Sequence, residues 1–184
     1  MREAVRLALL TTHVHTEAVD AAFVQAKAVA TLARVTSVRD FDSASVLEQL
    51  HDFAHTDAMK KKLGDVIIAC RKNWSAKVVL NRLCTPNRFG RHFQIRAVDA
   101  VACGLWTFAK FGHDPERCIC ETVELGGDTD TVGAMAGALV GALHGTPWLP
   151  LRWYMNIENE NDVGRDRIVS VASRLAQLDL RSVD

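Results

Sequence analysis

The 184-residue chain lacks an excess of charge of either sign, because 22 Lys and Arg balance 22 Asp and Glu. Such a chain has no broad electrostatic field with which to gather nucleic acid or to hold an anionic membrane. We therefore expect neither nucleic acid nor a membrane among its partners. The composition, 48% hydrophobic and 24% charged, is typical of a folded domain with a core and not of a fibrous or disordered protein.

Paired cysteine motifs are also missing. The five cysteines are odd in number, form no CxxC pair and lie mostly in apolar periodic segments. This pattern predicts buried free thiols in a reducing compartment. The N-terminal stretch MREAVRLALLTTHVH has a helical pattern and no small-residue cleavage site, so we interpret it as a helix and not as a signal peptide. A cytoplasmic location is expected.

An uninterrupted apolar run long enough to cross a membrane is absent as well. No Asp, Glu, Lys or Arg occurs from Thr131 through Leu151, but a glycine and two prolines interrupt the second half of this stretch. Its continuous helical part, from Thr131 to Leu143, would be about 20 Å long at about 1.5 Å per residue. A bilayer core needs about 30 Å. We therefore predict a buried central helix.

Strand signals are missing too. β-branched residues alternate over no window of strand length, whereas apolar residues recur at three- and four-residue spacing. The chain is therefore predicted to be all-α and to form one domain over residues 1–184. Beyond the N-terminal stretch, helices are predicted over residues 16–35, 43–54, 56–72, 75–83, 94–111, 115–125, 131–143 and 165–178. The three lysines at 60–62 are predicted to form a solvated helix face.

Residues 126–133, GGDTDTVG, place two carboxylates at the start of the apolar helix. One interpretation is helix capping, in which Asp128 or Asp130 caps the helix and both acids complement its dipole. The other is a metal site, because one cap needs only one acid. Asp128, Asp130 and the hydroxyl of Thr131 supply three hard oxygen donors, a set that suits Mg²⁺ or Ca²⁺. Spacing alone leaves both interpretations open.

The helix behind this motif is rich in glycine. Gly133, Gly137 and Gly141 recur at every fourth position and share one helix face. Interior glycines cost roughly 1 kcal/mol each relative to alanine, so this face gives up about 2 to 3 kcal/mol. Such a loss predicts the close approach of another backbone. The helix is also apolar nearly all round, which predicts a place in the middle of a helix bundle.

The segment LGGDTDTVGAMAGALVGALHG resembles the metal motif of the ADP-ribosylglycohydrolases. This family includes dinitrogenase-reductase activating glycohydrolase, the ADP-ribosylserine and ADP-ribosylarginine hydrolases and the J1 lens crystallins. Three more stretches are similar to family segments and stand in the same order: LTTHVHTEAVDAAFVQAKAVA, FGRHFQIRAVDAVACGLWTF and WLPLRW. The first departs from the family pattern in having Thr16 where proline is common.

The resemblance implies a compact all-α fold, an orthogonal multi-helix bundle, with two Mg²⁺ ions in a cleft. It implies hydrolysis of the glycosidic bond that joins ADP-ribose to a protein side chain or small acceptor. ADP-ribose or an ADP-ribosylated protein would be the partner. Carried over residue by residue, Asp128, Asp130 and Thr131 would be metal ligands, and His13 would lie in the segment that contacts the ADP-ribose side of the cleft.

The family also has an N-terminal half with a TDDT-type acidic cluster, an orienting glutamate and a glycine-asparagine-glycine loop. None of these occurs here, so the chain is expected to correspond to the C-terminal half of the domain, apparently N-terminally truncated. Two carboxylates are few for two divalent ions. We therefore expect the chain alone to be weak or inactive, unless a missing N-terminal segment completes the site. A catalytically inactive helical protein, like the crystallins, is the alternative.

Other polar side chains have competing interpretations. His13 and His15 form an HxH pair that could bind zinc, although no Cys or third His has partner spacing. For His13, contact with a ligand and capping of a helix both remain open. Arg91 and His92, in the loop TPNRFGRHF, could reach phosphates, although arginines in polar loops are usually solvated.

Overall fold

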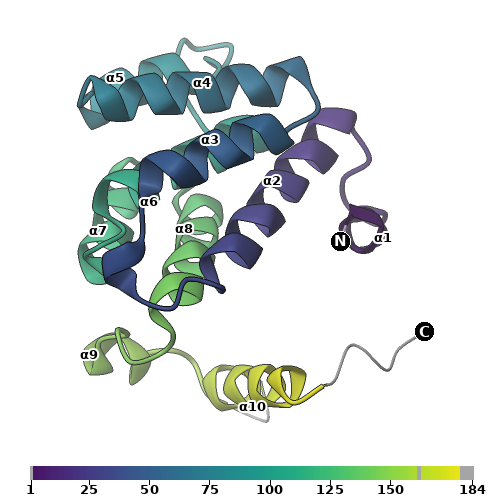
Figure 1. Ribbon diagram of the computed structural model, residues 1–184, viewed down its shortest axis with the longest axis vertical. Coiled ribbons are helices and arrows are strands. Elements are labelled where there is room, and N and C mark those ends of the chain that lie inside the picture. The colour runs from purple at the N-terminus through teal and green to yellow at the C-terminus, as the bar shows by residue number, and fades with distance from the viewer. Residues whose placement is uncertain (1, 161–162, 179–184) are drawn as a thin grey trace. The chain divides into compact units, whose positions relative to one another are not determined.

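A computed structural model describes residues 2–160 and 163–178, and the chain divides into two units, residues 1–148 and 149–184. Both units are helical (Figure 1). The prediction of an all-α chain is confirmed, since the described ranges contain no strand and only an isolated bridge between Pro86 and His92. The expectation of one domain stays a prediction.

The first unit contains the helices that the periodicity predicts, with ends that differ by a few residues. Their bounds are α1 Arg2–Leu9, α2 Thr16–Leu32, α3 Ser43–Phe53, α4 Asp57–Arg71, α5 Ala76–Leu83, α6 Ala97–Phe111, α7 Pro115–Glu124 and α8 Thr129–His144, with a short 3-10 turn at Val38–Asp40. The second unit contains α9, Leu151–Tyr154, which was not predicted, and α10, Arg165–Ala176. No residue of α9 or α10 is buried among the described residues.

Side-chain caps define several helix starts. Thr56 accepts a hydrogen bond from the N–H of Met59 at 3.2 Å and begins α4. Asp114 accepts one from the N–H of Arg117 at 3.1 Å, and Pro115 follows at the first position of α7. Both caps satisfy N–H groups that a helix start leaves unpaired. These starts depend on local chemistry, so the sequence was sufficient to predict them.

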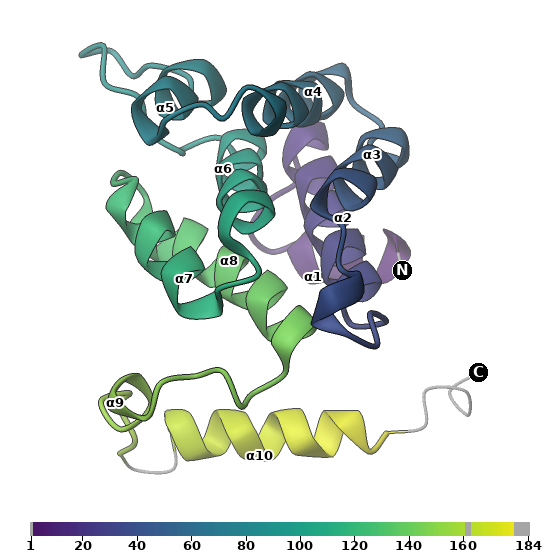
Figure 2. The ribbon, with the colours of Figure 1, turned by 60° about the vertical axis from the view of Figure 1, so that its left-hand side comes forward.

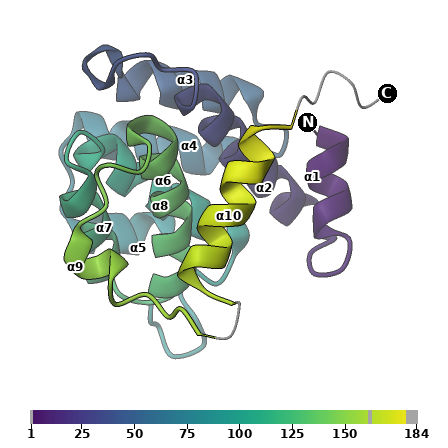
Figure 3. The same ribbon diagram turned by 90° about the horizontal axis from the view of Figure 1, so that it is seen from below.

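The core of the first unit is centred on α6. Every residue from 98 to 108 is buried, and α2, α4, α7 and α8 all pack against this helix. α8 packs in turn against α7 and α2. α1 and α7 lie on opposite sides of the unit in three views (Figure 1, Figure 2 and Figure 3). The three helices α2, α6 and α8 pack against one another in pairs.

A buried carboxylate fixes the N-terminal part of α2. Asp20 is 3% exposed and accepts hydrogen bonds at 2.8 to 3.1 Å from the N–H groups of His55 and Thr56 and from the Thr56 hydroxyl. The preceding helix, α1, is attached nearby, because the guanidinium of Arg2 lies 4.2 Å from the ring centroid of Phe53. These contacts position the loop between α1 and α2.

The surroundings of α8 differ from two expectations drawn from the sequence. It is not enclosed on all sides within the first unit, because Ala134 and Ala138 are exposed. A Cβ added to Gly133 or Gly137 would meet only a side-chain atom of α7, at 4.0 or 3.9 Å, and one added to Gly141 would meet no described atom within 4 Å. The prediction of close backbone approach at these glycines was therefore wrong for the described part of the chain.

Among the described residues, no helix is long and apolar enough to cross a membrane.

The prediction of a solvated lysine face was wrong for Lys62. Its side chain is 13% exposed, and its Nζ lies 2.7 Å from Oδ1 of Asp99, a fully buried residue of α6. Nζ also donates to the backbone oxygen of Leu83, and the other Asp99 oxygen accepts a hydrogen bond from the N–H of Thr85 at 2.8 Å. A carboxylate in the core needs a cation and hydrogen bonds close by: Lys62 supplies the cation, and the N–H of Thr85 supplies a hydrogen bond.

Candidate functional site

A cavity of about 910 Å³ lies where α2, α8 and the segment before α6 meet. Asp128 and Thr131 at the start of α8 line it, together with His13 from the α1–α2 loop. Small side chains account for much of the remaining wall and leave the space open: Ala18, Ala21, Ala22, Ala26, Ala97 and Ala100. The volume falls within the range of small-molecule sites, about 300 to 1,000 Å³.

The turn before α8 is held by Gln94, a residue that sequence reasoning did not single out. Gln94 is 1% exposed. Its Nε2 donates to the backbone oxygen of Gly126 at 3.2 Å, and its Oε1 accepts a hydrogen bond from the N–H of Asp128 at 3.0 Å. A helix was predicted from residue 94, but α6 begins only at Ala97, so Gln94 lies in the segment before it. A glutamine in such a segment has no pattern that could have revealed this contact.

Two glycines make this turn possible. Gly126 and Gly127 have φ values of +72° and +81°, in the left-handed region that favours glycine. A Cβ on Gly127 would also collide with Oε1 of Gln94, whereas one on Gly126 would meet no described atom within 4 Å. Glycine at 127 is therefore required by both backbone conformation and space.

Asp128 and Asp130 both lie at the start of α8. Asp128 occupies the N-cap position of α8, yet its side chain makes no capping hydrogen bond within the described residues. Oδ1 of Asp130 accepts a hydrogen bond from the N–H of Thr131 at 2.9 Å. The hydrogen-bonding side chain of Asp128, and next the N–H of Thr131, hold the pKa of the Asp130 carboxyl below its usual range. Neither acid thus makes the cap that the capping interpretation predicts, because Asp130 lies inside α8 and bonds the N–H of the next residue, and Asp128 makes no such bond among the described residues.

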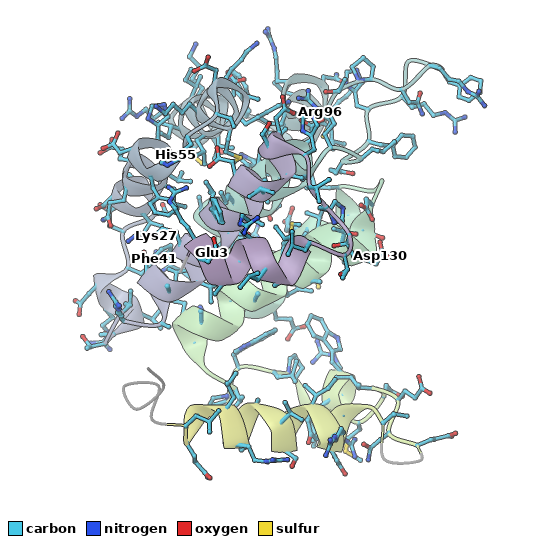
Figure 4. The ribbon with its side chains drawn as sticks, turned by 90° about the vertical axis from the view of Figure 1, so that its right-hand side faces the viewer. Glu3, Lys27, Phe41, His55, Arg96 and Asp130 are labelled. Atoms are coloured by element: carbon cyan, nitrogen blue, oxygen red, sulfur yellow. The ribbon has the colours of Figure 1, made fainter. Side chains whose placement is uncertain are left out.

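Of the predicted metal ligands, Asp128 and Thr131 line the cavity, whereas Asp130 is exposed and lies outside the lining. Figure 4 labels Asp130 at the start of α8. The two carboxylates and the hydroxyl are hard oxygen donors and suit a Mg²⁺ ion whose remaining positions are filled by water or substrate. They are too few for two such ions. Across residues 2–160 and 163–178, no group of three or more His, Cys, Asp and Glu side chains is placed to hold a metal ion.

The two histidines of the HxH pair have different roles. His15 is the N-cap residue of α2, and its Nδ1 accepts a hydrogen bond from the N–H of Glu17 at 3.3 Å. Both histidines are exposed and line the cavity, and His13 makes no helix-capping hydrogen bond among the described residues. The capping role therefore belongs to His15, and contact of His13 with a ligand stays a prediction.

An ion pair borders the same cavity. Arg96, labelled in Figure 4, pairs with Glu17 and donates from Nη1 to the Thr85 hydroxyl at 3.3 Å. The hydrogen bond with Glu17 raises the pKa of Arg96. Arg91 and His92, the sequence candidates for phosphate contact, do not belong to the cavity lining. His92 instead donates from Nδ1 to the backbone oxygen of Cys84 at 2.8 Å.

Gln25 ties the two long helices of the cavity together. Its Nε2 donates to the backbone oxygen of Met135 at 3.0 Å, so α2 and α8 are joined at the cavity wall. Its Oε1 is buried and accepts no hydrogen bond from any residue that the structure describes. The cavity as a whole combines an apolar wall of alanines with a small number of polar side chains.

Comparison with known proteins identifies relatives of this chain. The Escherichia coli protein YegU is 29% identical over 115 residues, which cover 60% of this chain and 34% of YegU. ADP-ribosylhydrolase ARH3 of Danio rerio is 43% identical over 63 residues, 34% of this chain and 16% of its own length. ADP-ribosyl-(dinitrogen reductase) glycohydrolase of Rhodospirillum rubrum is 39% identical over 64 residues, 35% of this chain and 22% of its own length.

These matches span about a third or less of the length of each of these relatives. No solved structure matches the chain significantly. The family profile described as ADP-ribosylglycohydrolase matches residues 1–183 and so includes every residue of the cavity. On the strength of this match, the chain belongs to the ADP-ribosylglycohydrolase family.

Proposed function

We propose that this chain carries the metal-binding part of an ADP-ribosylglycohydrolase site and serves in hydrolysis of the glycosidic bond of ADP-ribosylated proteins or ADP-ribose conjugates. Family membership supports the reaction class. The observation that carries the proposal is the cavity, which joins Asp128 and Thr131 of the acidic motif to His13. Residues far apart in the chain thus border a space of the size of a nucleotide-like ligand.

Asp128, Asp130 and Thr131 would hold one Mg²⁺, with water and substrate oxygens completing its ligand set. A bound Mg²⁺ would supply a Lewis acid that orients the ribose hydroxyls and a water molecule. A second ion, which the family resemblance implies, would need carboxylates from outside this set. A further N-terminal segment is the proposed source of those carboxylates.

The other cavity residues would bind and orient the ligand. His13 would contact the ADP-ribose from the α1–α2 loop, and the exposed nitrogens of Arg96 would favour an anionic group at the rim. The alanine wall would exclude water from the sugar and leave room for its ring. Holding the reacting groups in one geometry is a large part of what a site contributes to such a reaction.

Metal binding is tested by calorimetry and thermal unfolding with and without Mg²⁺. We expect Mg²⁺ to raise the melting temperature of the intact protein, because a ligand that binds only the folded state stabilises it. Asp128→Ala and Asp130→Ala should both abolish this rise. Asp57→Ala is a matched control, since Asp57 also lies in the first turn of a helix, α4, but outside the cavity. An unchanged melting temperature with Mg²⁺ would remove the proposed ligand assignment.

Activity is tested by incubating the protein with peptides ADP-ribosylated on serine or on arginine and measuring released ADP-ribose. We expect release by this chain alone to be slow, because its ligand set is small, and to depend on Mg²⁺ and on Asp128. His13→Ala should weaken binding of free ADP-ribose, while His51→Ala, on α3 and outside the cavity lining, should leave the affinity largely unchanged. The comparison of the two peptides identifies the acceptor residue.

A second candidate function is a non-catalytic helical protein of the same family. The observation that favours it is the small number of metal ligands, since the described residues hold no cluster of three or more suitable side chains. This candidate predicts binding of ADP-ribose or Mg²⁺ without turnover. Binding in calorimetry together with absence of released ADP-ribose would support it over the hydrolase.

A further inference from the structure

Two cysteines from different helices meet in the core of the first unit. Cys84 is the C-cap residue of α5, and Cys103 lies in the middle of α6. Their sulfur atoms are 3.5 Å apart, and the residues are 3% and 0% exposed. The spacing along the chain gives no hint of a pair, because no CxxC motif is present. The packing of α5 on α6 therefore brings together thiols that the sequence keeps apart.

The two thiols are not equivalent. The hydrogen bond with Cys103 lowers the pKa of Cys84, and the nearby charge of Lys62 acts in the same direction against burial and Asp99. The same hydrogen bond, and then burial, raise the pKa of Cys103. A thiolate is the reactive form of cysteine in exchange with disulfides. Cys84 also ends α5 beside the exposed Thr85, whereas Cys103 lies inside α6, so Cys84 is the attacking thiol and Cys103 completes the reaction.

We propose that Cys84 and Cys103 form a reversible intramolecular disulfide when the protein meets a small-molecule disulfide as oxidant. The Cys84 thiolate attacks one sulfur of the oxidant, breaks its S–S bond and releases one thiol. The Cys103 sulfur then attacks the Cys84 sulfur and releases the second thiol. The two protein thiols lose two electrons and two protons, which convert the oxidant into two thiols.

The local structure allows the short movement that this bond needs. A disulfide has a sulfur–sulfur distance of about 2.05 Å, so the two atoms must approach by about 1.5 Å. Cys84 ends α5 in an extended conformation, with φ −102° and ψ 138°, and the next residues, Thr85 and Pro86, are exposed. The oxidant reaches Cys84 only when this helix end opens locally, which breaks the hydrogen bonds of Leu83 with Lys62 and of Thr85 with Asp99, so oxidation should be slow.

The disulfide would tie the end of α5 to α6 and close the stretch between them into a covalent loop. That stretch contains Gln94, which holds the turn before Asp128. Restricting the unfolded chain in this way stabilises a folded protein. The oxidised protein should therefore melt at a higher temperature than the reduced one. This inference stands on the two cysteines alone and does not depend on hydrolysis of ADP-ribose conjugates.

The test is to equilibrate the intact reduced protein in glutathione buffers that range from reduced to oxidised, quench with acid and alkylate after unfolding. In oxidised buffer, we expect the number of free thiols to fall from five to three. Digestion with trypsin should give the peptides 83–88 and 97–110 joined by one bond, lighter by two hydrogens than the separate peptides. Reductant should reverse both changes.

Three variants make the test specific. Cys84→Ala and Cys103→Ala should each abolish the linked peptides and the rise in melting temperature on oxidation. Cys118→Ala is the matched control, because Cys118 is also buried, and it should retain both effects. If Cys84 and Cys103 of the wild-type protein stay alkylatable in every buffer, or if oxidation occurs only at the exposed Cys120, the proposal is wrong. The wild-type peptide map decides the question even where a variant fails to fold.

Discussion

Gln94 accepts a hydrogen bond from the N–H of Asp128 at 3.0 Å, and this contact joins the segment before α6 to the start of α8. The same side chain donates to the oxygen of Gly126. Without Gln94, the backbone oxygen of Gly126 and the N–H of Asp128 would need water as their hydrogen-bond partner. The orientation of Asp128 therefore depends on a residue that lies far away in the chain and beside it in the fold.

Gln94→Met is predicted to lower the free energy of unfolding by about 1 to 3 kcal/mol, because it keeps the volume but leaves the two backbone groups without their partner. Urea denaturation measures the change. The control is Gln49→Met on the exposed face of α3, where a change within about 0.5 kcal/mol is expected. Equal effects at both positions would contradict the assigned role of Gln94.

Replacement of the two turn glycines by alanine should have unequal effects. Both residues have positive φ, which costs a side-chain-bearing residue about 1 to 2 kcal/mol. Gly127→Ala adds a collision with Gln94, so it should destabilise the protein more than Gly126→Ala does. Thermal unfolding of the two variants side by side gives the order. The reverse order would show that the turn differs from the one described.

Lys62→Met should destabilise the protein strongly, because it leaves Asp99 buried without its cation. Removal of one partner of a buried pair typically costs about 3 to 5 kcal/mol. Lys61→Met, one residue away and exposed, is the matched control and should change stability by less than about 0.5 kcal/mol. The double variant Lys62→Met with Asp99→Leu should recover part of the loss, since it removes both charges. Chemical denaturation of all three variants tests the set.

Gly141→Ala in α8 is predicted to raise stability by up to about 1 kcal/mol, because alanine is the better helix former. A Cβ at this position meets no described atom within 4 Å. Thermal unfolding measures the gain. A large loss instead would mean that another part of the protein packs closely on this face.

Much of the fold was predictable from local pattern. Apolar spacing identified the main helices, and Asp114 and Pro115 indicated the start of α7, because capping and periodicity act within a few residues. The short helix α9 was missed, since four residues are too few for a periodic signal. The start of α6 was placed too early because an apolar pattern does not show where helical hydrogen bonding begins.

The sequence by itself determined an all-α chain and an acidic motif at the mouth of an apolar helix, since these depend on neighbours along the backbone. Only the tertiary structure decided that Asp128 and Thr131 share a cavity wall with His13, and that Lys62 is a core cation and not a solvated one. The physical reason is that burial and pairing depend on which helices pack together. That choice is made by the whole core and not by any single segment.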